Sequence, residues 1–195
     1  MASTVLPIRR SASGWETLRN GRRVFIRPIQ VGDADALVAF HEHLSDATRR
    51  WRFFTLHPHL SADEVARFTN VDHHRREALV AFSAGRLVGV GRFDATGDTS
   101  GEVAFVVADN RQAEGLGSRL LERLADWASD HGYTRLEADV LGGNAAMLRV
   151  FARYAPDRRI SFDSGVVHLE MPVTPRSVAA ARSRVGTAPS APAAR

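Results

Sequence analysis

The order of the predicted elements places the chain in the α/β (α+β) class, with a mixed, mostly antiparallel central sheet flanked by helices. Three observations predict this class. One strand and several short helices come first, consecutive strands fill the middle, and two helix–strand units follow. The strands therefore lack the regular alternation with helices of a doubly wound sheet. A length of 195 residues suits one domain with its own core.

The first part of the chain predicts one strand and three helices. Residues 21–29 alternate in hydrophobicity after a turn-like Asn-Gly pair, which predicts a strand. Apolar residues at helical spacing predict a helix capped by Asp33 and a second helix over residues 47–54. Ser61 and Glu64 have the spacing of a capping box, so a third helix is expected to begin there.

The second part predicts a hairpin followed by alternating elements. Two apolar runs joined by Ala84 and Gly85 predict paired strands. After Leu116 the apolar positions lie on one face of a helix, and Gly132 is suited to the position just beyond its end. The predicted elements are strands 77–83, 86–94 and 101–107, helix 116–128, strand 135–141, helix 144–154, and one bent or two separate strands in 159–171.

The two ends differ from the middle in composition. Residues 1–20 show no periodicity and predict a flexible leader, residues 21–174 form the predicted domain, and residues 175–195, rich in Ala, Pro and Arg, predict a disordered tail. The longest apolar runs are far shorter than the roughly 20 residues of a membrane span, and no signal-peptide core is present. We therefore expect a cytoplasmic protein without a membrane partner.

Composition excludes several chemistries. The chain has no cysteine, which removes disulfides, thiolate metal sites and a cysteine nucleophile. All 26 basic residues are arginine, so lysine Schiff-base chemistry is excluded, and the chain has no lysine side chain of its own to acetylate. The arginines occur as scattered pairs with acidic residues between them, so we expect no nucleic-acid partner.

The histidines do not predict a metal site. His41 and His43 are two residues apart on a predicted helix and point to different faces. The other histidine pairs, at positions 57 and 59 and at 73 and 74, lie in predicted loops without a carboxylate cluster at ligand spacing. We expect no metal, and no serine lies in a nucleophile elbow.

The segment over residues 103–118 runs from a strand into the start of a helix and carries the chemistry. Gln112, Gly115 and Gly117 form the pattern Q-x-x-G-x-G. Glycines let the backbone approach a ligand closely, and the first turn of a helix offers free N–H groups to a diphosphate. Arg111 is a candidate for an additional charged donor to this anion.

This pattern has two alternatives to a cofactor loop. A glycine-rich helix start also occurs as a simple tight turn between strand and helix. A dinucleotide loop needs a third glycine, and Leu120 occupies that position, without a leading βαβ unit. The dinucleotide alternative is therefore rejected.

The motif resembles the acetyl-CoA motif R/Q-x-x-G-x-G/A of the GNAT (GCN5-related N-acetyltransferase) family, and the order of elements matches over residues 22–173. The resemblance implies that the strand before the motif has a bulge and splays from the next strand, opening a V-shaped slot for the pantetheine arm. It also implies these cofactor-binding residues: Val106 and Val107 through their backbone, Asn144 at the next helix, and the diphosphate loop of Gln112, Ala113, Glu114, Gly115, Leu116, Gly117 and Ser118.

Three further segments resemble the bacterial Pat-type protein-lysine acetyltransferase branch: R-F-F at 52–54, F-T-N-V-D at 68–72 and E-V-A-F-V-V-A-D at 102–109. This resemblance implies acetyl-CoA as donor and a protein lysine as acceptor. Some members of the branch carry an additional regulatory domain, for which this chain has no room, so we expect a stand-alone catalytic domain.

The resemblance also implies the catalytic groups. Amide formation from a thioester needs a neutral amine, and Glu102 is the implied base, with a pKa raised by partial burial; the alternative is an exposed glutamate at a strand end without a role. The N–H of Val106 is the implied donor to the thioester oxygen. Where many family members place an acidic tyrosine this chain has Phe151, and the nearest tyrosine is Tyr154.

The sequence therefore predicts direct acetyl transfer to a primary amine in a ternary complex, by a monomer or homodimer. Two other functions stay open: a small-molecule acceptor, and a catalytically weak acyl-CoA-binding regulatory module.

Overall fold

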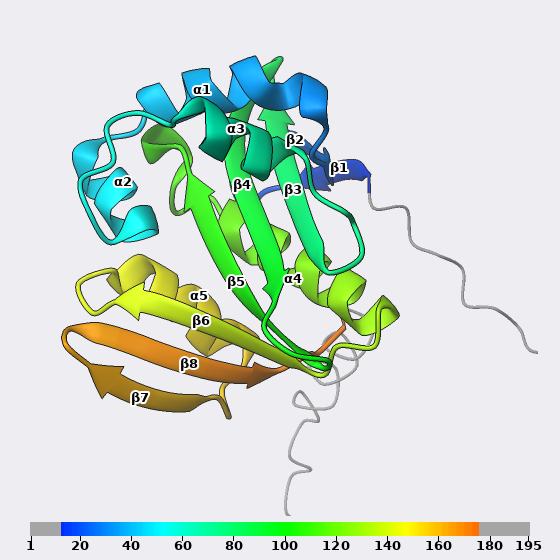
Figure 1. Cartoon of the computed structure of the whole chain (residues 1–195), viewed down its shortest axis with the longest axis vertical. Helices are drawn as coiled ribbons and strands as arrows, with labels where there is room; N and C mark the ends of the chain where they lie inside the picture. The colour runs from blue at the N-terminus through cyan, green and yellow to red at the C-terminus, as the bar shows by residue number, and fades with distance from the viewer. Residues whose placement is uncertain (1–12, 176–195) are drawn as a thin grey trace, which may run out of the picture.

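The computed structural model describes residues 13–175 (Figure 1). In chain order the elements are β1 (Gly14–Thr17), β2 (Arg23–Pro28), α1 (Ala34–Glu42), α2 (Asp46–Phe53), α3 (Ala62–Thr69), β3 (Arg76–Ser83), β4 (Arg86–Ala95), β5 (Ser100–Val107), α4 (Leu116–Asp130), β6 (Arg135–Leu141), α5 (Ala145–Tyr154), β7 (Arg159–Asp163) and β8 (Val166–Pro172). No described helix is long and apolar enough to cross a membrane.

The strands form one eight-stranded sheet in the order β1-β2-β3-β4-β5-β6-β8-β7. Neighbouring strands are antiparallel except for β5 and β6, which are parallel. The expected mixed, mostly antiparallel sheet is therefore confirmed. The last predicted segment is two strands, β7 and β8, joined at Ser164 and Gly165, which both have positive φ angles.

Helices cover both faces of the sheet. The apolar face of α4 and the buried Phe151 of α5 pack on one face, and α1 with the end of α3 packs on the other. In Figure 1, α1 and α3 lie in front of the central strands and α4 lies behind them. The central strand β4 is buried along most of its length because it is covered from both sides. Burial of this kind is the main stabilising term of such a layered domain.

The parallel pair β5 and β6 separates after a short contact. Their pairing runs only from Ser100↔Arg135 to Glu102↔Glu137, although β5 continues to Val107 and β6 to Leu141. Figure 1 shows the two strands meeting at one end and diverging toward α2. The expected splayed pair is confirmed. The expected bulge in β5 is absent from its pairing with β4, which is regular over all its pairs. The register shift lies instead in the pairing of β3 with β4, where Ala81 and Phe82 face Gly89 and Leu87 and leave Val88 of β4 as the extra residue.

Two expectations about local structure are corrected. The assignment of residues 1–20 to a flexible leader is wrong from Gly14 onward, because Gly14–Thr17 forms β1 and pairs with β2. Residues 1–12 and 176–195 lie outside the described part. Asp33 precedes α1 as expected, but its carboxylate does not cap the helix; it accepts two hydrogen bonds from Arg27 and one from the N–H of Gln30.

Candidate active site

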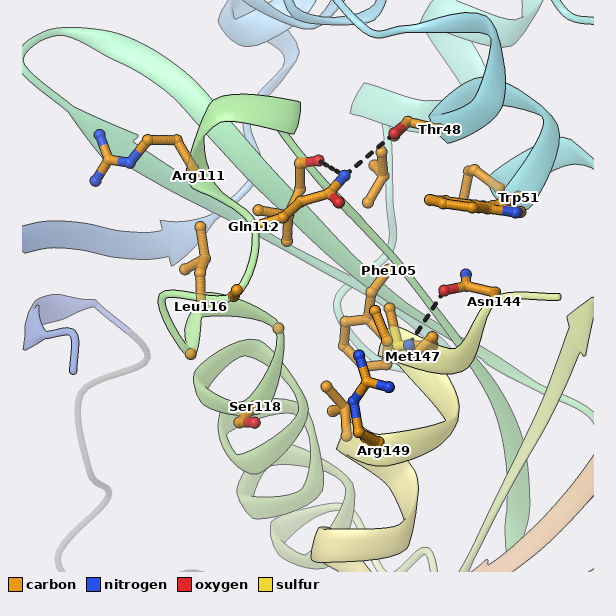
Figure 2. Close-up of a pocket in the computed structure, with 18 of the residues that line it drawn as sticks. Thr48, Trp51, Phe105, Arg111, Gln112, Leu116, Ser118, Asn144, Met147 and Arg149 are labelled. Atoms are coloured by element: carbon orange, nitrogen blue, oxygen red, sulfur yellow. Dashed lines mark hydrogen bonds between the residues drawn. The ribbon is translucent and has the colours of Figure 1, made fainter. Parts of the chain in front are cut away.

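A cavity of about 300 Å³ opens where β5 and β6 diverge. Figure 2 shows side chains from α2, β5, α4 and α5 around it. The cavity is lined by Arg19, Thr48, Trp51, Arg52, Phe105, Val106, Val107, Arg111, Gln112, Ala113, Gly115, Leu116, Gly117, Ser118, Asn144, Ala146, Met147, Arg149, Val150 and Arg153. Among these described residues every charged side chain is an arginine, so the wall is suited to an anionic ligand.

The first turn of α4 presents backbone N–H groups to this cavity. Gly115 precedes the helix with a φ of +95°, and no side chain caps the helix there. By contrast, side-chain oxygens of Ser45, Ser61 and Asn144 accept hydrogen bonds at the starts of α2, α3 and α5. The first-turn N–H groups of α4 are therefore available to a diphosphate, and the helix dipole favours a negative charge at the same place.

A glycine in the sheet determines how closely the start of α4 approaches β4. A Cβ on Gly89 of β4 would lie 2.9 Å from Cδ2 of Leu116, the first residue of α4. The missing side chain lets α4 approach the sheet closely, and Leu116 is almost fully buried there. The anion-binding turn is thus fixed by core packing.

Gln112 connects the loop to α2. Its Nε2 donates to Oγ1 of Thr48 at 3.1 Å and to the carbonyl of Val107 at 3.3 Å, as Figure 2 shows. Thr48 in turn donates to Asp109 at 2.7 Å. Asp109 also accepts from the backbone and side chain of Ser45. These bonds hold α2 against the end of β5. Gln112 takes part by joining Thr48 of α2 to the carbonyl of Val107 in β5.

Arg111 contributes to the wall, but its guanidinium is directed elsewhere. Its Nε donates to Glu114 at 2.9 Å and its Nη1 to Ser83 at 3.1 Å, and Figure 2 shows it pointing away from Trp51 and Asn144. Glu114 also pairs with Arg22 at 3.0 Å and does not line the cavity. The bonds of Arg111 engage Nε and Nη1, whereas Nη2 is buried without a hydrogen-bond partner among the described residues, so the expected contact of Arg111 with the diphosphate stays a prediction.

Asn144 is buried at the start of α5. Its Oδ1 accepts from the backbone N–H of Met147 at 3.1 Å, which caps the helix. Its amide NH₂ lines the cavity without a hydrogen-bond partner among the described residues. The amide can therefore donate to a ligand while the carbonyl holds the helix.

The hydrogen bonds of β5 determine which backbone groups face the opening. The carbonyl of Thr99 accepts from the N–H of Arg135 at the start of β6, while the N–H of Ala108 donates to Val88 at the start of β4. Backbone groups alternate in direction along a strand. Val106 therefore directs its N–H toward β4, and Phe105 and Val107 direct theirs toward the opening. The expected donor role of the Val106 N–H is corrected to these two neighbours.

Glu102 lies in the last residue pair before β5 and β6 diverge, a place called here the vertex of the splay. It is on the same face of β5 as Val106. It does not line the cavity and is exposed to solvent. Although the side chain is exposed, the surrounding protein partly desolvates its carboxylate, and this desolvation raises the pKa of Glu102 above its ordinary value. The nearby carboxylate of Asp139 raises this pKa further, while the guanidinium of Arg52 lowers it. Asp94 and Glu137 add smaller raising contributions to this pKa. A carboxylate with a raised pKa is a better proton acceptor for an amine.

The geometry fits an enzyme that binds a diphosphate-bearing acyl donor beside a carboxylate base, and the comparisons agree. The profile of the acetyltransferase (GNAT) family matches residues 38–155. The chain belongs to this family. Acetyl-CoA is the acyl donor in this family, and the protein is an acetyl-CoA-dependent N-acetyltransferase.

Individual relatives agree with this assignment. The acetyltransferase PA5475 of Pseudomonas aeruginosa is 31% identical over 137 residues, which cover 68% of this chain and 74% of that protein. The acetyltransferase Pat of Mycolicibacterium smegmatis is 29% identical over 161 residues, which cover 81% of this chain and 48% of Pat, so the GNAT protein spans about half the length of that relative.

Solved structures agree as well. The crystal structure of the GNAT domain of S. lividans PAT matches with a TM-score of 0.77 and 37% identity, over 82% of this chain and 96% of that one. A putative acetyltransferase of Salmonella typhimurium, solved with acetyl-CoA, has the same fold with a TM-score of 0.61 and 19% identity, over 77% of this chain and 94% of that one.

The acetyltransferase has no tyrosine at its cavity among the described residues. Phe151 is buried in the core between α4, α5 and the sheet, in ring contact with Phe105. Tyr154 accepts from the N–H of Thr174 at 2.8 Å, and burial raises its pKa to about 12. The hydroxyl of Tyr154 is thus held by the backbone of Thr174 and does not line the cavity.

Four residues from the N-terminal part of the chain line the cavity without a site role predicted from the sequence: Arg19, Thr48, Trp51 and Arg52. The last three belong to α2, whose position over the opening depends on contacts with β5 and Asp109 that no local pattern reveals. Arg19 was assigned to the leader. The Asn-Gly pair at positions 20–21, preceded by Trp15 and Leu18, is a hairpin signal that would have placed Arg19 in an ordered turn.

Proposed function

We propose that the acetyltransferase transfers acetyl directly from acetyl-CoA to a primary amine, the side chain of a protein lysine, within a ternary complex. The observation that carries the proposal is the splay of β5 from β6, with the uncapped start of α4 on its cavity side and Glu102 at its vertex. Donor and acceptor then meet along one strand, β5.

The residues of the site divide the chemistry between them. The diphosphate lies on the N–H groups of residues 113–118, and Asn144 donates its amide to the pantetheine arm. The N–H groups of Phe105 and Val107 face the arm, and Phe105, which is nearer to Glu102, donates to the thioester oxygen as negative charge develops there. The arrangement orients the carbonyl before the amine arrives.

Glu102 takes the proton that the attacking amine loses. A lysine ammonium has no lone pair, so proton removal must precede or accompany attack on the thioester carbon. The C–N bond then forms, the C–S bond breaks, and the electron pair leaves with the CoA sulfur. Because no tyrosine, histidine or cysteine lines the described cavity, the sulfur departs as a thiolate and takes its proton from solvent.

The surroundings of Glu102 favour a cationic acceptor. Glu137 and Asp139 follow each other on the same face of β6, and Asp94 pairs with Glu102 across β4 and β5. A field of carboxylates attracts an ammonium group and slows anionic acceptors. The resemblance to the Pat-type branch supports a protein lysine as that ammonium group.

The test is incubation of the protein with acetyl-CoA and candidate acceptors, followed by mass spectrometry. We expect acetyl-lysine on protein acceptors at a higher kcat/KM than on polyamines, amino acids or aminoglycosides. Because the chain itself has no lysine, every acetyl-lysine detected belongs to the acceptor.

The matched variants are Glu102→Gln and Glu42→Gln. Glu42 is an exposed glutamate at the end of α1, outside the cavity. Glu102→Gln is expected to lower kcat by roughly 10²- to 10⁴-fold with unchanged CoA affinity, and Glu42→Gln to change neither. Faster transfer to small amines favours the small-molecule alternative. CoA binding without transfer to any amine favours the regulatory module, which the core position of Phe151 keeps under consideration.

A further inference from the structure

The β1–β2 hairpin is fastened to the start of α4. Leu18, in the turn, is buried in the core against α4. Glu16 in β1 pairs with Arg123 of α4 at 2.9 Å, and Arg22 after the turn pairs with Glu114 at 3.0 Å. These contacts attach the hairpin at two points along α4 and its preceding loop.

Arg19 lies at the tip of this hairpin and against the diphosphate loop. Its backbone N–H donates to the carbonyl of Glu114 at 3.1 Å. A Cβ placed on Gly115 would lie 3.4 Å from both Cγ and Nε of Arg19, so the side chain passes directly over this glycine. Arg19 lines the cavity, and its guanidinium has no hydrogen bond or ion pair with any residue in the described range 13–175.

The other cavity arginines are engaged or lie elsewhere. Arg111 is held by Glu114 and Ser83 through Nε and Nη1, and its Nη2 is buried without a partner among the described residues. Arg149 and Arg153 come from α5, across the cavity from the hairpin, and Arg52 comes from α2 beside Glu102. Arg19 is therefore the arginine whose side chain lies on Gly115, where the first-turn N–H groups of α4 begin.

We propose that the guanidinium of Arg19 binds the diphosphate of CoA, which makes the N-terminal hairpin a third wall of the donor site. This inference rests on the proposed function only in taking CoA as the ligand of the cavity. A guanidinium presents parallel N–H donors that match phosphate oxygens, and such charge-assisted bonds are among the strong ones in proteins. Arg22 and Glu114 act as positioning residues, because their ion pair holds the hairpin against the loop.

The test measures binding of CoA and 3′-dephospho-CoA by calorimetry, and kcat and KM with acetyl-CoA and with S-acetylpantetheine, which has no phosphate. Arg19→Gln is expected to weaken binding of CoA and dephospho-CoA by the same factor, about tenfold, while the kcat/KM for S-acetylpantetheine is unchanged. Arg19→Lys is expected to recover part of the affinity. The loss is expected to shrink at high salt, because the site is open to solvent.

The matched control is Arg23→Gln. Arg23 lies in the same hairpin and stacks over the ring of Trp15, outside the cavity, so this variant removes the same charge without touching the loop. An equal loss in Arg19→Gln and Arg23→Gln would overturn the inference, because it would reflect net charge alone. A loss for CoA without one for dephospho-CoA would also overturn it, since Arg19 would then contact the 3′-phosphate. If the wild-type protein binds neither compound, the proposed function itself fails.

Discussion

The cavity and the vertex of the splay lie next to each other along β5 and differ in charge. The cavity wall carries Arg19, Arg149 and Arg153 and, among its described residues, no carboxylate. The vertex carries Glu102 with the carboxylates of Asp139, Asp94 and Glu137 in electrostatic range. Under the proposed function, this difference explains how one strand can hold two substrates of opposite charge: the cationic side would take the phosphates of the donor, and the acidic side would attract the ammonium of the acceptor.

Arg52 stands between the two regions. It lines the cavity from α2 and also faces Glu102, and burial lowers its pKa while Glu102 and Asp94 raise it. It makes no hydrogen bond or ion pair with another described residue; its closest aromatic contact is with Phe53. A cation in this place favours the ionised form of the Glu102 carboxylate, the proposed base, beside its acidic neighbours.

Apart from the loss of the Glu102 carboxylate itself, the largest expected effect comes from placing a negative charge on the cationic side. In Gly117→Asp a carboxylate is added to the first turn of α4, where the nearest atom to the new Cβ is Cγ2 of Val150 at 3.9 Å. The side chain fits and the helix dipole favours it, but it repels the diphosphate, so the Kd for CoA is expected to rise about 100-fold in calorimetry.

Gly117→Ala is the control for bulk alone, and it is expected to change the Kd by less than about threefold. The thermal unfolding midpoint of Gly117→Asp is expected to equal or exceed that of the wild type. Equal CoA affinity in the two variants would contradict the assignment of the cationic side.

The next largest effect is expected at Arg52, the cation between the two regions, and concerns the pH dependence of activity. Glu102 must be deprotonated to act, so activity falls as the pH drops through its raised pKa. Arg52→Met removes the group that lowers this pKa, so the acid limb of kcat/KM is expected to move to higher pH. Activity is lost several-fold at acidic pH and recovers at alkaline pH. Arg52→Lys is expected to retain the wild-type profile, and a profile that does not move in Arg52→Met would refute the role.

A smaller effect of opposite sign is expected on the acidic side. Asp139→Asn removes a carboxylate that raises the pKa of Glu102, so the acid limb is expected to move to lower pH. The same change weakens attraction of a cationic acceptor, and KM for a lysine peptide is expected to rise about two- to fivefold, because Asp139 is about half exposed. KM for acetyl-CoA measured in parallel is expected to stay constant; an equal rise in both would show that the two regions are not separate.

The smallest effect on transfer is expected for Tyr154→Phe, which lies outside both charged regions. The change removes the hydrogen bonds with Thr174 and is expected to lower the free energy of unfolding by about 1–2 kcal/mol in urea denaturation. Turnover at saturating substrates is expected to be unchanged. A large loss of kcat with intact folding would assign Tyr154 the acid role that its position argues against.

The helices and strands and the donor-binding loop could be predicted from the sequence, because both depend on local patterns. The hairpin turn at Ala84 and Gly85, the capping box at Ser61 and the Gly115–Gly117 helix start all appear where the sequence places them. The orientation of Val106 was missed because it depends on which neighbour a strand residue faces, which is a property of the sheet register.

Other parts of the site depend on contacts across the chain. The guanidinium of Arg111 donates a hydrogen bond to Ser83, which is 28 residues away in sequence. The side chain of Arg19 lies against Gly115 because the pairing of β1 with β2 forms the hairpin that carries it. The charge difference between the two regions likewise arises from residues on the β1–β2 hairpin, α5, β4, β5 and β6. No local periodicity reports such contacts, so these features required the folded structure.

The most direct test of the charge-divided site is a crystal structure of the protein with CoA bound. The account predicts the diphosphate on the N–H groups of residues 113–118 with the guanidinium of Arg19 on it, and the sulfur in the opening between β5 and β6 on the side of Glu102. A diphosphate bound away from the start of α4, or a sulfur directed away from Glu102, would contradict it.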